Sequence, residues 1–105
     1  MRKCGILLIA CCVFVFVAAV NAADMTGGEK LYKSCAGCHG KNGQTMALGV
    51  GKALKGQPAN VILDKLNGYA DGTYGGSKKK IMTNIIKRMS QEDRVKVSEY
   101  ISTFK

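Results

Sequence analysis

Residues 34–40 read SCAGCHG, where two cysteines stand beside the only histidine of the chain. Thiolates and imidazoles bind soft and borderline metals, and a thiolate is also a nucleophile. A C-x-x-C spacing is typical of structural zinc sites, of thioredoxin-like redox pairs and, when His follows directly, of covalent haem attachment. Cys35, Cys38 and His39 are therefore the first candidates for function.

The rest of the sequence argues against two of these three sites. A structural zinc site needs four ligands, and usually a second Cys or His pair, which is absent from the chain after residue 39. A thioredoxin-like pair is expected after a strand, within an alternation of strands and helices, and we find no convincing strand pattern after the N-terminal segment.

Covalent haem attachment remains. In this chemistry the thiols of Cys35 and Cys38 add to the vinyl groups of the porphyrin, and His39 ligates the iron. Two thioethers clamp one edge of the ring, so the adjacent imidazole reaches the metal with little conformational freedom left. The sequence therefore predicts one covalently bound haem c.

The second axial ligand of the iron decides between electron transfer and ligand chemistry. Because no second histidine exists, methionine is the natural candidate. Met25 precedes the first expected helix on the attachment side, and Met46 follows His39 too closely to reach the opposite face easily. Spacing leaves Met82 and Met89 equally placed, and both belong to a helical apolar stripe that also fits a plain core role.

The N-terminal segment has the order of a secretory signal peptide. Arg2 and Lys3 precede fifteen apolar residues, Ile6 to Val20, and Val20-Asn21-Ala22 suits a signal peptidase. We expect residues 1–22 to be removed. An uncleaved membrane anchor and lipid attachment at Cys11 are the alternatives.

The expected mature chain, residues 23–105, reads as a single domain with a thin core. Without Arg2 and Lys3 it has fourteen basic and seven acidic residues, a net charge of +7. This charge suits an acidic protein surface or an anionic membrane, whereas export makes nucleic acid an improbable partner.

The elements around the motif are expected to be helices and glycine-rich loops. A capping-box pattern at Thr26–Glu29 predicts a first helix from about Gly27 to the motif. Residues 40–56 form an irregular loop against a ligand, with a flexible surface loop as the alternative. A second helix starts at Pro58, runs to Leu66 and is closed by Asn67-Gly68, with three apolar residues facing inward: Ile62, Leu63 and Leu66.

Two further helices follow a loop over residues 68–76. Ser77 is expected to cap a helix over residues 78–89, and Ser90 to cap the last one. That last helix has an apolar stripe formed by Val97, Tyr100, Ile101 and Phe104. The predicted fold class is all-α.

Three stretches of the chain, LYKSCAGCHG, GYADGTYGG and KKKIMTNIIKR, resemble the small monohaem class I cytochromes c, specifically the cytochrome c-553 type of sulfate-reducing bacteria. The resemblance covers nearly all of the expected mature chain. It implies about four short helices wrapped around one haem c, with thioether links at Cys35 and Cys38. It also implies His39 as the proximal ligand and Met82, not Met89, as the distal ligand.

The resemblance has two further implications for the structure. The first and last helices should cross, which would place Gly27 and Leu31 against Tyr100. Many class I cytochromes also have a proline about a dozen residues after the ligand histidine, whose carbonyl accepts the second ring N–H. This chain lacks that proline, so we expect a backbone carbonyl near Gly49–Gly51 to take its place.

With both axial positions filled by protein, the expected function is one-electron transfer by a soluble, monomeric periplasmic carrier that is not an enzyme and is not stably inserted in a membrane. The resemblance suggests electrons arriving from a dehydrogenase such as formate dehydrogenase, or passing to a hydrogenase or oxidase. The basic charge balance and the run of Lys78, Lys79 and Lys80 beside the proposed distal ligand suggest docking to an acidic partner, with a plain solvated helix end as the alternative. The alternatives are gas binding, as in cytochromes c′, and peroxidase chemistry. The former usually has its motif near the C-terminus, and the latter needs a distal acid or base beside an open iron.

Overall fold

A computed structural model describes the backbone of residues 21–105 and the side chains from residue 27 onward. This part of the chain contains five α-helices and one short 3-10 turn, and no strand. The all-α prediction is therefore confirmed. Nearly all of the predicted signal peptide lies outside the described residues. No helix in residues 21–105 is long and apolar enough to cross a membrane.

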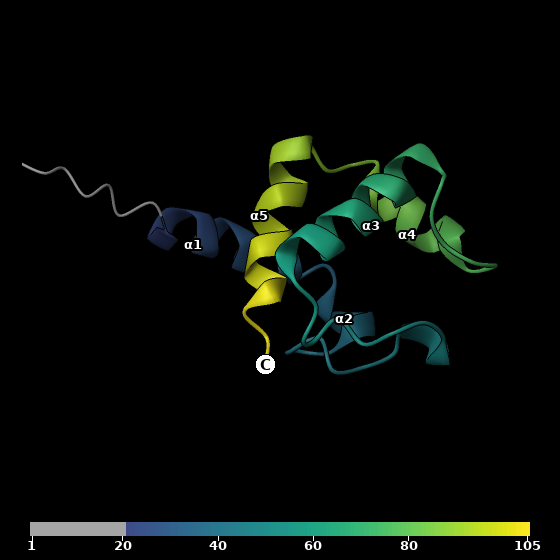
Figure 1. Cartoon of the computed structure of the whole chain (residues 1–105), viewed down its shortest axis with the longest axis horizontal. Helices are drawn as coiled ribbons and strands as arrows, with labels where there is room; N and C mark the ends of the chain where they lie inside the picture. The colour runs from purple at the N-terminus through teal and green to yellow at the C-terminus, as the bar shows by residue number, and fades with distance from the viewer. Residues whose placement is uncertain (1–20) are drawn as a thin grey trace, which may run out of the picture.

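Helix α1, Asn21–Tyr32, begins six residues before the predicted start at Gly27. Thr26 therefore lies inside the helix, and the interpretation of residues 26–29 as a capping box at its start is wrong. The predicted crossing of the first and last helices is confirmed, since α1 packs against α5 (Figure 1). The close approach is made at Gly28, where a Cβ would lie 2.5 Å from the Lys96 carbonyl oxygen, and not at Gly27.

The haem motif forms a short helix of its own, α2, Ala36–His39, which the sequence did not predict. The chain then enters the expected irregular segment, which contains only the 3-10 turn η1, Ala47–Gly49. Leu48 has a φ of 55°, the one positive φ of a residue other than glycine between positions 21 and 105.

Helix α3, Ala59–Asp71, continues well past the predicted end at Leu66 and is closed by Gly72 in the left-handed conformation. Gly68 lies inside the helix because the following loop folds back onto it. The N–H groups of Thr73 and Tyr74 both donate to the Gly68 carbonyl, and a Cβ at Gly68 would lie 2.5 Å from that of Tyr74.

Helix α4, Lys79–Ile86, is shorter than the predicted helix over residues 78–89. Ser77 is not its cap, because the N-cap position is Lys78 and has no side-chain hydrogen bond. Helix α5, Gln91–Ser102, begins as predicted, since the Ser90 hydroxyl accepts a hydrogen bond of 3.0 Å from the Asp93 N–H.

The core lies where α5 packs against α1 and α3, while α4 covers another part of α3 (Figure 1). Its ring system, Tyr32, Tyr100 and Phe104, is held in edge-to-face and tilted contacts with centroids 5.0–5.7 Å apart. Of the stripe predicted for the last helix, only Tyr100 is not fully buried. The buried apolar side chains are Tyr32, Ile62, Leu66, Ile86, Val97, Ile101 and Phe104.

Candidate functional site

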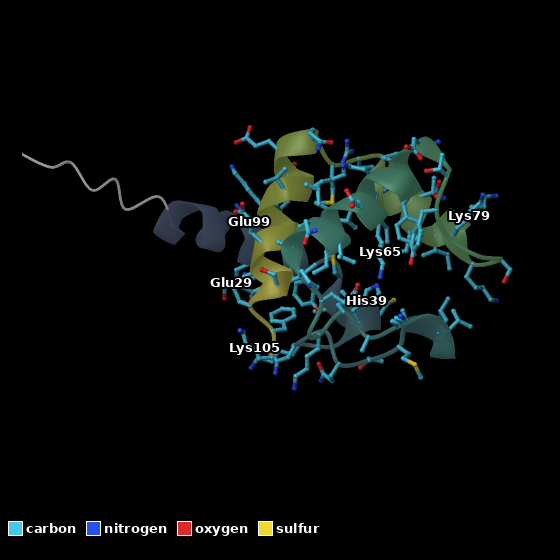
Figure 2. The ribbon with its side chains drawn as sticks, viewed as in Figure 1. Glu29, His39, Lys65, Lys79, Glu99 and Lys105 are labelled. Carbon is cyan, nitrogen blue, oxygen red and sulfur yellow. The ribbon has the colours of Figure 1, made fainter. Side chains whose placement is uncertain are left out.

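A cavity of about 410 Å³ lies between the segment that carries α2 and η1 and the faces of α3 and α4, and two residues of α5, Val97 and Ile101, contribute to its lining. Two residues of the cavity lining are labelled in Figure 2: His39 at the end of α2 and Lys65 on α3. Most of the lining side chains are aliphatic or aromatic. A largely apolar cavity with a few polar groups is typical of a cofactor site.

The two cysteines and the histidine meet in the wall of this cavity. The N–H groups of Cys38 and His39 both donate to the Cys35 carbonyl, at 3.2 and 3.0 Å, so one tight helical turn brings the three side chains to the cavity. Cys35 is partly buried and Cys38 is exposed.

His39 has two buried ring nitrogens, Nδ1 and Nε2, and neither has a hydrogen-bond partner. The predicted bond to a carbonyl of Gly49–Gly51 is thus not among the interactions of the described residues. Burial lowers the pKa of His39, so the imidazole is neutral near pH 7, as a metal ligand must be. Buried polar atoms are normally satisfied, so two unpaired nitrogens in a cavity wall indicate a bound group.

Both methionines that spacing left open contribute to the cavity wall. Met82 lies within α4, whereas Met89 lies beyond the end of that helix, in the turn that leads to α5. Met46 is 52% exposed and is not among the cavity residues. The side chain of Met25 lies outside the described part of the structure.

Several other residues of the site carry no sequence motif. Gln57, at the end of the loop, and Lys65, on α3, share a hydrogen bond in the cavity wall. Tyr69 and Tyr74 form an edge-to-face pair with centroids 5.0 Å apart and also reach the cavity. The stretch GYADGTYGG indicated these tyrosines only as part of a family pattern.

The residues present fit a covalent haem. Cys35 and Cys38 lie one turn apart beside His39, the histidine nitrogens need a partner, and a thioether is available from α4. The exposed rim of the cavity includes three apolar side chains, Leu48, Val50 and Ile81, which are each about half exposed. Apolar side chains around an opening are suited to contact a large flat ring.

Comparison with known proteins agrees with this geometry. The cytochrome c family model matches residues 25–105. The chain is 48% identical to cytochrome c-553 of Nitratidesulfovibrio vulgaris, over 97% of this chain and 98% of that protein. It is 40% identical to cytochrome c-553 of Desulfomicrobium norvegicum, over 74% of this chain and 95% of that protein. A cytochrome c-554(548) of Halomonas halodenitrificans is 32% identical, over 78% of this chain and 98% of that protein.

Members of this family carry covalently attached haem c and transfer electrons, which agrees with the cavity and with the motif in its wall. The chain belongs to the cytochrome c family, as a small class I member of the cytochrome c-553 type that carries one haem c and exchanges electrons with redox partners.

Proposed function

We propose that this protein is a periplasmic one-electron carrier whose haem is held by Cys35 and Cys38 and ligated by His39 and Met82. The observation that carries this proposal is the presence of all four side chains in the wall of one apolar cavity, where the His39 nitrogens have no other partner. The haem supplies one-electron exchange between Fe(II) and Fe(III).

The protein residues set the conditions for that exchange. Cys35 and Cys38 fix the ring to one helical turn, and the neutral His39 donates a nitrogen from that same turn. Met82 donates a soft thioether sulfur, which favours Fe(II) and raises the reduction potential relative to a second histidine. The aliphatic residues of α3 and α4 exclude water from the iron.

Met82 is preferred to Met89 for two reasons. Its neighbours, KKKIMTN, match the distal segment of the cytochromes that the sequence resembles. It also lies inside α4, whereas Met89 follows the helix and its carbonyl accepts a hydrogen bond of 3.0 Å from Arg94. Met89 therefore acts in packing at the turn before α5.

The apolar segment at residues 6–20 and the small residues up to Ala22 support export and cleavage, and hence a mature periplasmic protein of residues 23–105. It acts as a monomer and a carrier, not as an enzyme. Its donor is a periplasmic dehydrogenase such as formate dehydrogenase, and a hydrogenase or oxidase is the alternative partner.

The surface that meets these partners is proposed to be the rim of the cavity next to α4. Lys78 and Lys79 are exposed residues of the cavity lining, Lys80 is the next exposed residue on α4, and Ile81 is 48% exposed beside them. An apolar centre next to several positive charges suits a partner with an acidic surface.

The axial ligands are tested by the absorption spectrum of the haem-loaded protein with and without carbon monoxide. The reduced wild type should have a sharp α band that the gas leaves unchanged, and the oxidised form a weak sulfur-to-iron band near the red edge. Met82→Ala should open the iron, bind carbon monoxide, lose the weak band and lower the reduction equilibrium constant by about tenfold or more, that is by about 59 mV or more.

Met89→Leu is the matched control, because it removes the other thioether of the cavity wall with little change in volume. It should leave the spectrum and the potential nearly unchanged. If Met89→Leu loses the weak band and Met82→Ala keeps it, the ligand is Met89. Carbon monoxide binding by the wild type would contradict six-coordinate iron altogether.

A further inference from the structure

A cation in the wall of the cavity has no role in the function described so far. Lys65 lies on α3, is partly buried, and its Nζ donates a hydrogen bond of 2.6 Å to Oε1 of Gln57. The Gln57 Nε2 in turn donates to the Ala53 carbonyl at 2.7 Å. Loop residues therefore hold the ammonium group of Lys65 at the cavity.

The charges around the cavity are all of one sign among the described residues. Its lining contains four lysines and neither aspartate nor glutamate: Lys52, Lys65, Lys78 and Lys79. The other three lysines are exposed, so water screens them. Lys65 is the one that is both partly buried and held in place by a side chain.

Removing an ammonium group from water is unfavourable, and pairing or hydrogen bonding offsets that cost. Lysine has three N–H donors, and Gln57 is a neutral acceptor for one of them. The peripheral charges of a haem are the carboxylates of its two propionates. An anionic carboxylate at the edge of the ring is therefore the group that would complement this cation.

We propose that Lys65, positioned by Gln57, pairs with a propionate carboxylate of the haem and thereby raises the reduction potential of the iron. This inference rests on the proposed function. The physical reason is Coulombic: Fe(II) carries one positive charge less than Fe(III), so a nearby fixed cation favours the reduced state. A pair shielded from water has a larger effect than an exposed one of the same charge.

The test is a redox titration of haem-loaded variants at constant salt. Lys65→Gln and Lys65→Met should each lower the reduction equilibrium constant by about three- to tenfold. A tenfold decrease corresponds to a reduction potential lower by about 59 mV. Lys65→Arg keeps the charge and should stay within about twofold of the wild type. Gln57→Ala should give an intermediate loss, because the ammonium is then less well positioned.

Lys52→Gln is the matched control, since Lys52 also contributes to the cavity but is exposed. It should change the equilibrium constant by less than about twofold. The proton chemical shifts of the propionate methylene groups give a second readout, and they should move in the two neutral Lys65 variants and not in Lys52→Gln.

Equal small effects of Lys65→Gln and Lys52→Gln, with unmoved propionate signals, would overturn the pairing. That result leaves the proposed function intact as long as the wild type shows an intact six-coordinate spectrum. If Lys65→Met disturbs the spectrum through poor packing, Lys65→Gln and Gln57→Ala decide the matter. A wild type that binds carbon monoxide would instead refute the proposed ligands and not the role of Lys65.

Discussion

Gly28 sets how closely α1 can approach α5. A Cβ at this position would lie 2.5 Å from the Lys96 carbonyl oxygen and 2.6 Å from the Tyr100 Cβ. The expectation that Gly27 makes this contact was wrong by one residue, since the nearest atom to a Cβ there is the flexible Lys96 Cδ at 3.5 Å. On a helix, a shift of one residue turns the side chain by about 100°.

This difference gives a matched pair of variants. Gly28→Ala is expected to lower the free energy of unfolding by about 1–3 kcal/mol, because a backbone carbonyl and a core ring must move apart. Gly27→Ala should instead raise it by about 0.5–1 kcal/mol, through helix propensity alone. Each kcal/mol corresponds to about 4–8 °C in the melting temperature of a domain this small, as measured by circular dichroism. Equal melting temperatures for the two variants would contradict the contact at Gly28.

At the scale of elements, the turn between α4 and α5 depends on one arginine. The Arg94 guanidinium donates to the Asn67 amide oxygen on α3 at 2.9 Å and to the Met89 carbonyl at 3.0 Å, and it also reaches Gln91. It therefore ties α5 to α3 and to the end of the segment that carries Met82. A planar guanidinium with several donors suits such a three-way contact.

Arg94→Ala is expected to lower the free energy of unfolding by about 1–3 kcal/mol, because it leaves the Asn67 oxygen and the Met89 carbonyl without this donor. Arg88→Ala is the control, since Arg88 is an exposed arginine close to the same turn. It should change stability by less than about 0.5 kcal/mol. Thermal unfolding of the two haem-loaded variants makes the comparison, and similar losses in both would show that charge near the turn matters and the Arg94 contacts do not.

At the scale of the whole molecule, the exposed lysines lie at different distances from the haem cavity. Lys79 is at the end of the molecule where α4 begins, and Lys105 is at the C-terminus, well away from it (Figure 2). If the cavity rim is the docking surface, position should matter more than total charge. Electrostatic steering acts through the local field at the contact face.

The triple variant of Lys78, Lys79 and Lys80 to Gln is therefore expected to slow the second-order reaction with the physiological donor by about tenfold or more at low salt. The wild-type rate should fall steeply as salt rises, because exposed charges are screened beyond about 10 Å at 0.1 M. Lys30, Lys33 and Lys105 to Gln is the control triple, because it removes the same charge from exposed positions outside the cavity. Equal slowing by both triples would leave only a general effect of net charge.

The sequence by itself determined the chemistry of the site and the class of fold. The C-x-x-C-H motif predicts haem attachment because its three residues lie within about one helical turn. Their spacing in the sequence therefore sets their relative positions in space. The cap at Ser90 and the stripe of Val97 and Ile101 were readable for the same reason, since each depends on contacts within a few residues.

Only the tertiary structure decided the features that depend on contacts between distant segments. The end of α3 was missed because Gly68, which resembles a helix terminator in the sequence, is required for the close return of Tyr74. Gly28 and Arg94 owe their roles to neighbours on other helices. Gln57 and Lys65 carry no motif, and the cavity wall that they share exists only once the loop has folded against α3. Local patterns encode local geometry, whereas the choice of partner across the core is made by packing.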